Sequence, residues 1–448
     1  MKPAGYGETQ PRLSDDRLPI VLVILDGVGD RPIGELGWRT PAEAARTPNL
    51  DALARRGASG WHLPFGWGRA PASELAHWAM FGYATVPFPG RAVLEALGAG
   101  LDVDHDSAVT HASLRTSRRD GDRVWITGRA RPADAPDAAG LLTGLGPVLA
   151  GRGMSLQQLG GHGEALLTAP AHRCADVTDS DPLFESFHPW MQPIPTSPGG
   201  APFAEALTEA LQAARTYLRA SDINTARVQR GLPALNLLTT KWSGRRGHIP
   251  SFTEQVGIAG AAVTSTRLYR GIAAALGMTS VHIHPGDDLE TDMAARLDAA
   301  AELIAAGARF VHVHTKATDE AGHTKLPHAK RDALEAVDRG LASLAQLADR
   351  AIVAVTGDHA TPSTHGVLHT GDPTPLLVAG PTVRPDTVTE WGELPARQGW
   401  WGQVRADELL PLLLGQANRP VFLGHRITAR PVIALADSPQ PMPIDDGP

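Results

Sequence analysis

The chain has 448 residues, more than one ordinary hydrophobic core organises, so two or three domains are expected. Its net charge of −7 excludes nucleic acid as the main partner, because proteins that bind polyanions carry basic patches. No apolar run approaches the ~20 residues needed to cross a bilayer, so no membrane partner is expected.

The cysteine content and the beginning of the chain predict a cytoplasmic protein. Cys174 is the only cysteine and cannot form an intramolecular disulfide, which is usual in a reducing compartment. Residues 1–17 are polar and lack the apolar middle of a signal peptide. We expect residues 1–17 and 437–448 to be flexible tails, because both are rich in Pro, Gly and charged residues.

The first strong element is the apolar run PIVLVILDG, residues 19–27, which is typical of a parallel strand buried on both faces. The stretch TPAEAARTPNLDALARRGA, residues 40–58, has helical periodicity and ends in Arg-Arg-Gly, which predicts a helix. Residues 297–323 and 329–359 each predict a helix followed by a strand. This alternation is typical of an α/β fold with a mostly parallel sheet and helices on both faces.

The middle of the chain has a different pattern. Residues 106–252 contain short alternating segments, many Gly and Pro, and one clear helix, APFAEALTEALQAARTYLRA, at 201–220. We interpret them as an α+β domain inserted into the α/β domain, which would then comprise residues 18–105 and 253–436.

Ligand-type side chains follow three of the predicted strands, and ligands collect at the carboxyl ends of strands in open α/β sheets. Asp319 and His323 are spaced i, i+4, so a helical turn would place both on one side. Carboxylates and imidazoles at one sheet edge suit two divalent ions such as Mn²⁺ or Zn²⁺, and ions ~3.5 to 4 Å apart can hold a phosphoryl group during in-line displacement. The candidate ligands are Asp26, Asp319, His323, Asp358, His359 and His369.

Ser73 is a candidate nucleophile, because it lies among small residues just before the helical segment ELAHWAMFGY. At a helix N-terminus and on a metal, its hydroxyl would deprotonate more easily. Helix capping, with Glu74 adding charge to the first turn, explains the same residues without any chemistry.

Five stretches, in this order, resemble the archaeal-type cofactor-independent phosphoglycerate mutases of the alkaline phosphatase superfamily: LVILDGVGDRP, TPAEAARTPNLDALARRGASG, GRAVLEALGAG, TKATDEAGH and TGDHATPSTHGVLHTGDPTPLLV. The inserted region shares TDSDP and INTARVQRGLPALN with the same family. The resemblance implies an alkaline-phosphatase-like fold in which residues 18–105 and 253–436 bind metal. Residues 106–252 would form the substrate-binding, or cap, domain.

The same resemblance implies a dinuclear site. Its cofactors would be two divalent metal ions, Mn²⁺ first, with Zn²⁺, Mg²⁺ and Co²⁺ as alternatives. Ser73 would be the nucleophile and Lys316 would lie against the phosphoryl group. One ion would be held by Asp26, Ser73, Asp358 and His359, and the other by Asp319, His323 and His369.

The substrate pocket departs from the family pattern. Lys241 and Trp242 stand where the family has an arginine and a glycine, and a lysine does not replace the planar fork of an arginine. Gly163 stands where a second arginine is expected. Arg115 is the candidate replacement. The substrate contacts that the resemblance implies are Arg115, His162, Asp181, Arg227 and Lys241.

We therefore expect a phosphotransferase or phosphomutase that works through a phosphoserine on a small phosphorylated acid. One alternative is a specialised-metabolism paralogue that transfers a phosphonate or phosphonoformyl-type group to or from phosphoglycerate in phosphonate antibiotic biosynthesis. Another is a metal-dependent phosphatase. An alternative of another class is a non-catalytic, metal-stabilised binding protein. The sequence predicts no particular oligomeric state.

Overall fold

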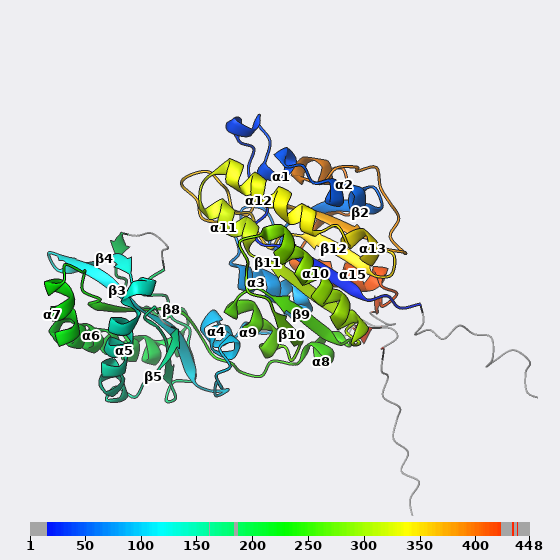
Figure 1. Cartoon of the computed structure of the whole chain (residues 1–448). Coiled ribbons are helices and arrows are strands. Elements are labelled where there is room, and N and C mark those ends of the chain that lie inside the picture. Colours follow the sequence, from blue (N-terminus) through cyan, green and yellow to red (C-terminus); the bar gives the residue numbers. More distant parts are fainter. Residues whose placement is uncertain (1–15, 161, 183–186, 423–431, 434–436, 438–448) are drawn as a thin grey trace, which may run out of the picture. The chain divides into compact units, whose positions relative to one another are not determined.

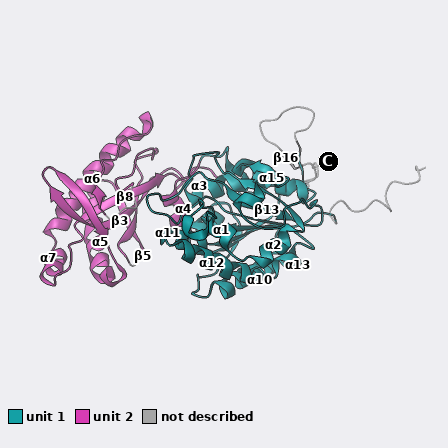
Figure 2. Cartoon of the chain, turned by 90° about the horizontal axis from the view of Figure 1, so that it is seen from above, with its two compact units in different colours: residues 1–87, 250–448 teal, residues 88–249 magenta. Residues whose placement is uncertain are grey.

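The computed structural model describes residues 16–160, 162–182, 187–422, 432–433 and 437. The chain divides into two compact units, shown in Figure 2: unit 1 comprises residues 1–87 and 250–448, and unit 2 comprises residues 88–249. The sequence placed the insertion at residues 106–252. Unit 2 begins earlier because helix α4 (Arg91–Gly98) packs on strand β8 (Leu237–Gly244) of the same unit.

Unit 1 is built on an eight-stranded sheet in the order β10-β9-β11-β1-β12-β13-β2-β14. Among these strands, Figure 1 labels β2, β9, β10, β11 and β12. Neighbouring strands run parallel except at β13, which is antiparallel to both β12 and β2. The predicted mostly parallel sheet is therefore confirmed. Its strands are β1 Ile20–Leu25, β2 Gly57–His62, β9 Gly260–Thr264, β10 Thr279–His282, β11 Phe310–Thr315, β12 Ile352–Thr356, β13 Thr374–Ala379 and β14 Gly402–Val404.

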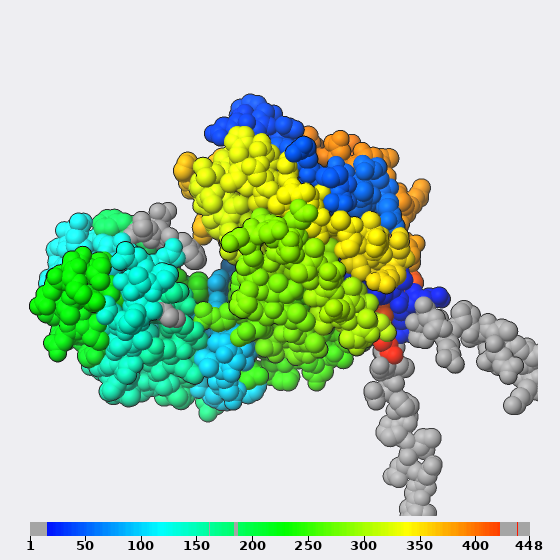
Figure 3. Space-filling view, in the orientation of Figure 1, coloured from blue at the N-terminus to red at the C-terminus, as the bar shows by residue number. Residues whose placement is uncertain are grey.

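One face of this sheet is covered by four helices. Strand β1 is buried at every position, and its alternate residues Val21, Val23 and Leu25 belong to the core beneath these helices. Figure 3 shows α10 and α12, in yellow-green and yellow, over the face of unit 1 turned to the viewer. The helices are α2 Pro48–Ala54, α10 Leu289–Ala305, α12 Pro327–Gly340 and α13 Leu344–Leu347.

Helices also cover the opposite face, as predicted. Here the ring of Phe310 on β11 lies 5.6 Å from that of Phe81 and 5.0 Å from that of Phe252, measured between centroids. Phe81 belongs to a π-helical turn, η2, that continues helix α3 and contacts helix α15. These elements are α3 Ser73–Trp78, η2 Ala79–Tyr83, α8 Phe252–Val256, α9 Arg267–Ala275 and α15 Ala406–Gln416.

The helix predicted over residues 40–58 is broken in the structure. Helix α1 (Pro41–Ala44) is followed by an extended Ala45, and α2 starts only at Pro48. Pro48 explains the interruption, because a proline disfavours helical conformation in the residue before it. From Gly57 the chain forms strand β2, which the sequence did not predict.

Unit 2 is an α+β structure with an antiparallel sheet in the order β5-β6-β3-β4-β7, and β8 pairs with β3. Leucines of α5 and α6 form the core with the sheet, and α6 spans the predicted residues 201–220. The elements are β3 Ala108–Asp120, β4 Arg123–Arg129, β5 Ser155–Gly160, β6 Glu164–Ala169, β7 His188–Pro189, η3 Pro132–Asp134, α5 Ala135–Ala150, η4 Pro198–Gly200, α6 Ala201–Ala220 and α7 Asp222–Gln229.

Most of the two predicted tails lies outside the described residues. Where they are described, Arg17 and Asp437 form an ion pair of 2.9 Å, and Asp437 also pairs with Arg419 at 2.9 Å. Among the described helices, none combines the length and the apolar character that a bilayer span requires. The remaining short elements are η1 Gly34–Leu36, α11 Ala317–His323, α14 Glu393–Ala396, β15 Val421–Phe422 and β16 Val432–Ile433.

Candidate metal centre

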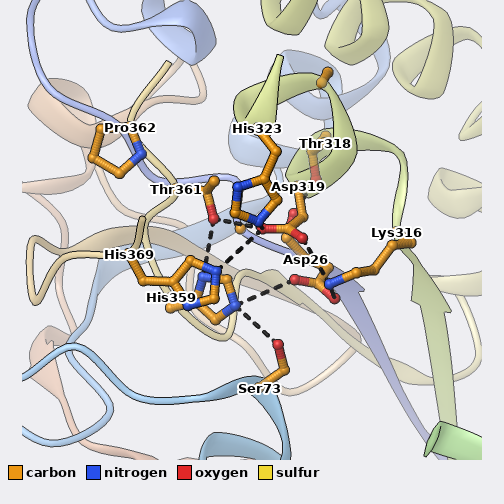
Figure 4. Close-up of polar contacts among 12 residues, drawn as sticks. Asp26, Ser73, Lys316, Thr318, Asp319, His323, His359, Thr361, Pro362 and His369 are labelled. Atoms are coloured by element: carbon orange, nitrogen blue, oxygen red, sulfur yellow. Dashed lines mark hydrogen bonds and ion pairs between the residues drawn. The ribbon is translucent and has the colours of Figure 1, made fainter. Parts of the chain in front are cut away.

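The candidate ligands of unit 1 lie at the carboxyl ends of three adjacent parallel strands. Asp26 follows β1, Asp358 and His359 follow β12, and α11 begins directly after β11. Because β1 lies between β11 and β12, the carboxylate of Asp26 lies between the residues that follow β12 and those of α11. Figure 4 shows the resulting cluster.

The first group converges on the Nε2 atom of His359. Ser73 Oγ lies 3.0 Å from it, Asp26 Oδ1 3.4 Å and Asp358 Oδ2 3.5 Å. Asp26 Oδ1 and Asp358 Oδ2 are buried and have no hydrogen-bond partner. Buried carboxylate oxygens are rarely left without a partner in folded proteins. These two therefore fit the ligand set of a cation, together with the hydroxyl and the imidazole.

The second group consists of Asp319, His323 and His369. Asp319 and His323 both lie in α11, and His323 Nε2 is 3.3 Å from Asp319 Oδ1. His369 Nε2 is 3.7 Å from the same oxygen and has no hydrogen-bond partner although it is buried. The three ligand atoms lie within 4.8 Å of one another, as do those of Asp26, Asp319 and His359. The residues present thus fit two neighbouring divalent cations.

Lys316 joins the two groups. Its Nζ lies 2.9 Å from Asp26 Oδ2 and 2.7 Å from Asp319 Oδ2. Burial alone would lower the pKa of Lys316, but the two carboxylates raise it above its ordinary value, so the amine stays charged. Burial and the charge of Asp26 raise the pKa of Asp358 to about 7. A cation between these two carboxylates would remove this repulsion.

The structure assigns Ser73 a position that does not match helix capping. Ser73 is the first residue of α3, the N-cap is Ala72, and no side-chain capping bond is formed. The capping explanation is therefore wrong for this serine. Its hydroxyl faces His359 instead (Figure 4).

Two threonines that support the ligands were missed by the sequence analysis. Thr361 Oγ1 donates to Asp319 Oδ1 at 2.6 Å and lies 3.2 Å from His359 Nδ1, so it contacts a residue of each group. Thr318 donates its hydroxyl to the backbone carbonyl of Asp26. The one signal in the sequence was that each threonine lies one or two residues from a candidate ligand.

The predicted substrate-binding residues belong to unit 2, and three of them lie near one another. Arg115 Nε donates to Asp181 Oδ2 at 2.7 Å, and His188 Nε2 lies 3.2 Å from Asp181 Oδ1. Burial, reinforced by the charge of Arg115, lowers the pKa of Lys241 to about 8. An anion beside two such cations would be favoured, because it would relieve their mutual repulsion. His162 is exposed.

Arg227 requires a correction. Its side chain is fully buried and bonds to Asp134 at 2.9 Å, to Asp137 at 2.8 Å and to the Pro233 carbonyl at 3.1 Å. No part of the guanidinium reaches solvent, because these three partners enclose it inside unit 2. A structural ion pair explains Arg227 better than the predicted substrate contact does.

Comparisons with known proteins place the chain among metal-dependent mutases. Residues 18–414 match the family model described as Metalloenzyme superfamily. The 2,3-bisphosphoglycerate-independent phosphoglycerate mutase of Pyrococcus abyssi is 34% identical over 415 residues, covering 90% of this chain and 98% of the relative. A solved structure of a Pyrococcus horikoshii protein is 30% identical with a TM-score of 0.73 and covers 90% of this chain and 98% of that one. The cofactor-independent phosphoglycerate mutase of Thermoplasma acidophilum is 29% identical with a TM-score of 0.59, over 89% and 99%.

Proposed function

The chain belongs to the metalloenzyme superfamily and to the 2,3-bisphosphoglycerate-independent phosphoglycerate mutases, and from this premise we propose that it transfers a phosphoryl group through a phosphoserine on Ser73. In the proposed reaction the serine oxygen attacks phosphorus while the bond from phosphorus to the substrate oxygen breaks. A second attack, by an acceptor hydroxyl, then releases Ser73. The acceptor decides the outcome: a neighbouring hydroxyl of the same bound molecule gives a mutase, and water gives a phosphatase.

The observation that carries this proposal is the position of the Ser73 hydroxyl. It is part of a buried group in which His359 Nε2 lies 3.0 Å away and two carboxylate oxygens have no hydrogen-bond partner. Two divalent cations, when bound, would neutralise the charge of the phosphoryl group there, and Mn²⁺ suits the mixed oxygen and nitrogen donors. A binding protein without catalysis would not need a nucleophile in this position.

Lys316 is the proposed phosphoryl contact in unit 1. Its amine is charged and lies between the two carboxylates Asp26 and Asp319, and the side chain as a whole is a quarter exposed. A lysine in this state can meet an anionic oxygen without changing its protonation. Within unit 2, Arg115 and Lys241 are the proposed anion contacts, because both are cationic side chains beside Asp181.

A second candidate substrate is favoured by Trp242. Its φ of 61° lies in the left-handed region, where a glycine is the ordinary residue. The guanidinium of Arg91 lies 3.9 Å from the Trp242 ring centroid and Lys241 Nζ lies 4.4 Å from it, so the ring contacts two cations. This arrangement supports a specialised paralogue that handles another phosphorylated acid or a phosphonate, including transfer of a phosphonoformyl-type group.

A paired assay of the Mn²⁺-loaded protein and its Ser73→Ala variant tests the proposal. We expect the wild type to interconvert 3-phosphoglycerate and 2-phosphoglycerate and the variant to lose this activity by at least ~10³-fold, as loss of a nucleophile does elsewhere. Aryl phosphate cleavage that depends on Ser73, without interconversion, would favour the second candidate. If neither activity nor a phosphorylated Ser73 appears with any donor, while cations still bind, the proposal is wrong and a binding protein remains.

A further inference from the structure

Asp26 has two carboxylate oxygens in very different surroundings. Three donors surround Oδ2: the hydroxyl of Tyr269 at 2.7 Å, Nε2 of His314 at 3.0 Å and Nζ of Lys316 at 2.9 Å. Oδ1 is buried, has no hydrogen-bond partner and lies 3.4 Å from His359 Nε2. The carboxylate is therefore fixed through one oxygen and offers the other to the candidate cation.

Tyr269 reaches Asp26 from helix α9, and His314 reaches it from the neighbouring strand β11. His314 is the last residue but one of strand β11, which pairs with β1, and Tyr269 lies in α9, just after β9 on the far side of β11. Their rings are tilted by 32°, with centroids 3.5 Å apart, and both side chains are almost completely enclosed. Neither can turn away from Asp26 without moving the other.

The protonation of this group follows from its contacts. Ser265 Oγ lies 2.6 Å from His314 Nδ1. A hydroxyl that donates to Nδ1 leaves the imidazole proton on Nε2, where it can be donated to Asp26. The hydroxyl of Tyr269 donates to Asp26 Oδ2 at 2.7 Å, so its hydrogen is directed to that oxygen.

Tyr269 also touches the nucleophile. The side chains of Ser73 and Tyr269 interact, and Ser73 Oγ also lies 3.0 Å from His359 Nε2. The phenol therefore contacts both a candidate ligand and the candidate nucleophile.

We propose that Tyr269, held by His314, is a positioning residue of the metal centre: it fixes Oδ2 of Asp26 and so leaves Oδ1 as the ligand atom. This inference rests on the proposed function of the site. It concerns the cation on the side of Asp26, Ser73, Asp358 and His359. Among the described hydrogen bonds of the Tyr269 hydroxyl, none goes to Asp319, His323 or His369, which would hold the other cation.

The test is Tyr269→Phe, which removes one hydroxyl and keeps the ring. Metal-free protein is titrated with Mn²⁺, and bound and free ions are counted by electron paramagnetic resonance. We expect one of the two Mn²⁺ ions to bind 10- to 100-fold more weakly, as with other groups that orient a ligand, and the other to bind as in the wild type. The matched control is Tyr83→Phe, since Tyr83 is a buried tyrosine of unit 1 whose hydroxyl donates to the Pro250 carbonyl at 2.9 Å.

Two results would overturn the inference. One is unchanged affinity for both ions in Tyr269→Phe. The other is an equal loss at both ions accompanied by lower thermal stability of the metal-free chain, which would mean a purely structural role. If Tyr269→Phe does not fold, Ser265→Ala replaces it, with a smaller loss expected at the same single ion. A wild type that binds no Mn²⁺ would contradict the proposed function itself, and the two failures are thereby distinguished.

Discussion

Glu393 is a buried carboxyl group outside the metal centre. It accepts hydrogen bonds from the Thr40 hydroxyl at 2.6 Å and from the Asp30 backbone N–H at 3.2 Å. Burial is the largest cause that raises the pKa of Glu393, from an ordinary 4.5 to about 7. The folded chain therefore holds a proton that the unfolded chain releases at a lower pH.

This shift predicts a pH dependence of the stability of unit 1. The stabilisation from the protonated Glu393 is complete below about pH 4.5 and is lost as the pH rises through 7. One pKa unit corresponds to ~1.4 kcal/mol, so the loss between pH 5 and 8 is on the order of 2–3 kcal/mol. Glu393→Gln should remove this part of the loss, and urea unfolding of the wild type and the variant at several pH values measures the difference. The control is Glu302→Gln on the exposed side of α10. A slope that Glu393→Gln leaves unchanged would contradict the assignment.

The sequence predicted individual side chains well only where residue type and strand end coincide. Asp26, Asp358 and His359 directly follow buried apolar strands, so their place at one edge follows from the parallel sheet. Tyr269 and Thr361 have no such signal. A tyrosine in an amphipathic helix is usually a core residue, and its contact with a carboxylate depends on how α9 packs, which no local pattern contains. The substrate contact predicted for Arg227 also missed its long-range packing, because Asp134 and Asp137, which pair with it, are distant in the sequence.

The turn after β1 determines where Asp319 can lie. Gly27 has a φ of 62°, and a Cβ atom there would lie 2.4 Å from Thr361 Oγ1 and 2.6 Å from Asp319 Oδ1. The backbone conformation and the close approach thus both require glycine. The turn holds the end of β1 directly against a ligand of the second group.

Gly27→Ala should therefore displace Asp319 and the threonine that bonds to it. We expect the cation held by Asp319, His323 and His369 to bind at least ~10-fold more weakly. Separately, the left-handed conformation of an alanine should lower the free energy of unfolding by ~1–2 kcal/mol. Gly37→Ala separates the two effects, because Gly37 has a φ of 69° but nothing within 4 Å of an added Cβ. Isothermal titration with Mn²⁺ measures both variants. If Gly27→Ala binds both ions as tightly as Gly37→Ala does, the turn does not position Asp319.

Elements with a strong pattern over their whole length were predicted correctly. Strand β1 is apolar at each position and is buried on both faces, and α6 keeps helical periodicity over 20 residues. The prediction of one helix over residues 40–58 was wrong for two reasons. Pro48 interrupts the helical periodicity, and β2 contains glycine and serine, which are poor strand formers. The position of β2 between β13 and β14 compensates for this composition, and the local sequence does not show that tertiary effect.

At the scale of the whole molecule, an insertion was predictable because the pattern of elements changes and then returns. Its limits were less predictable. Helix α4 precedes the first strand of unit 2 in the chain, and nothing in its own sequence indicates that it packs on β8 rather than on the α/β sheet. The pairing of β3 with β8, about 125 residues apart at Leu114 and Leu238, is likewise a long-range contact.

The division into two units makes a last prediction about metal removal. All seven candidate ligands belong to unit 1, so bound cations stabilise unit 1 and not unit 2. A cation present at ~1,000 times its dissociation constant contributes about 4 kcal/mol. Treatment with a chelator should therefore increase amide hydrogen exchange in peptides that contain β1, β11, α11 and β12, and leave those from α5 and α6 unchanged. Asp319→Asn is the control, because the chelator should have a smaller effect on a chain that has already lost one ligand. Equal increases in both units would contradict the prediction that bound cations stabilise unit 1 and not unit 2.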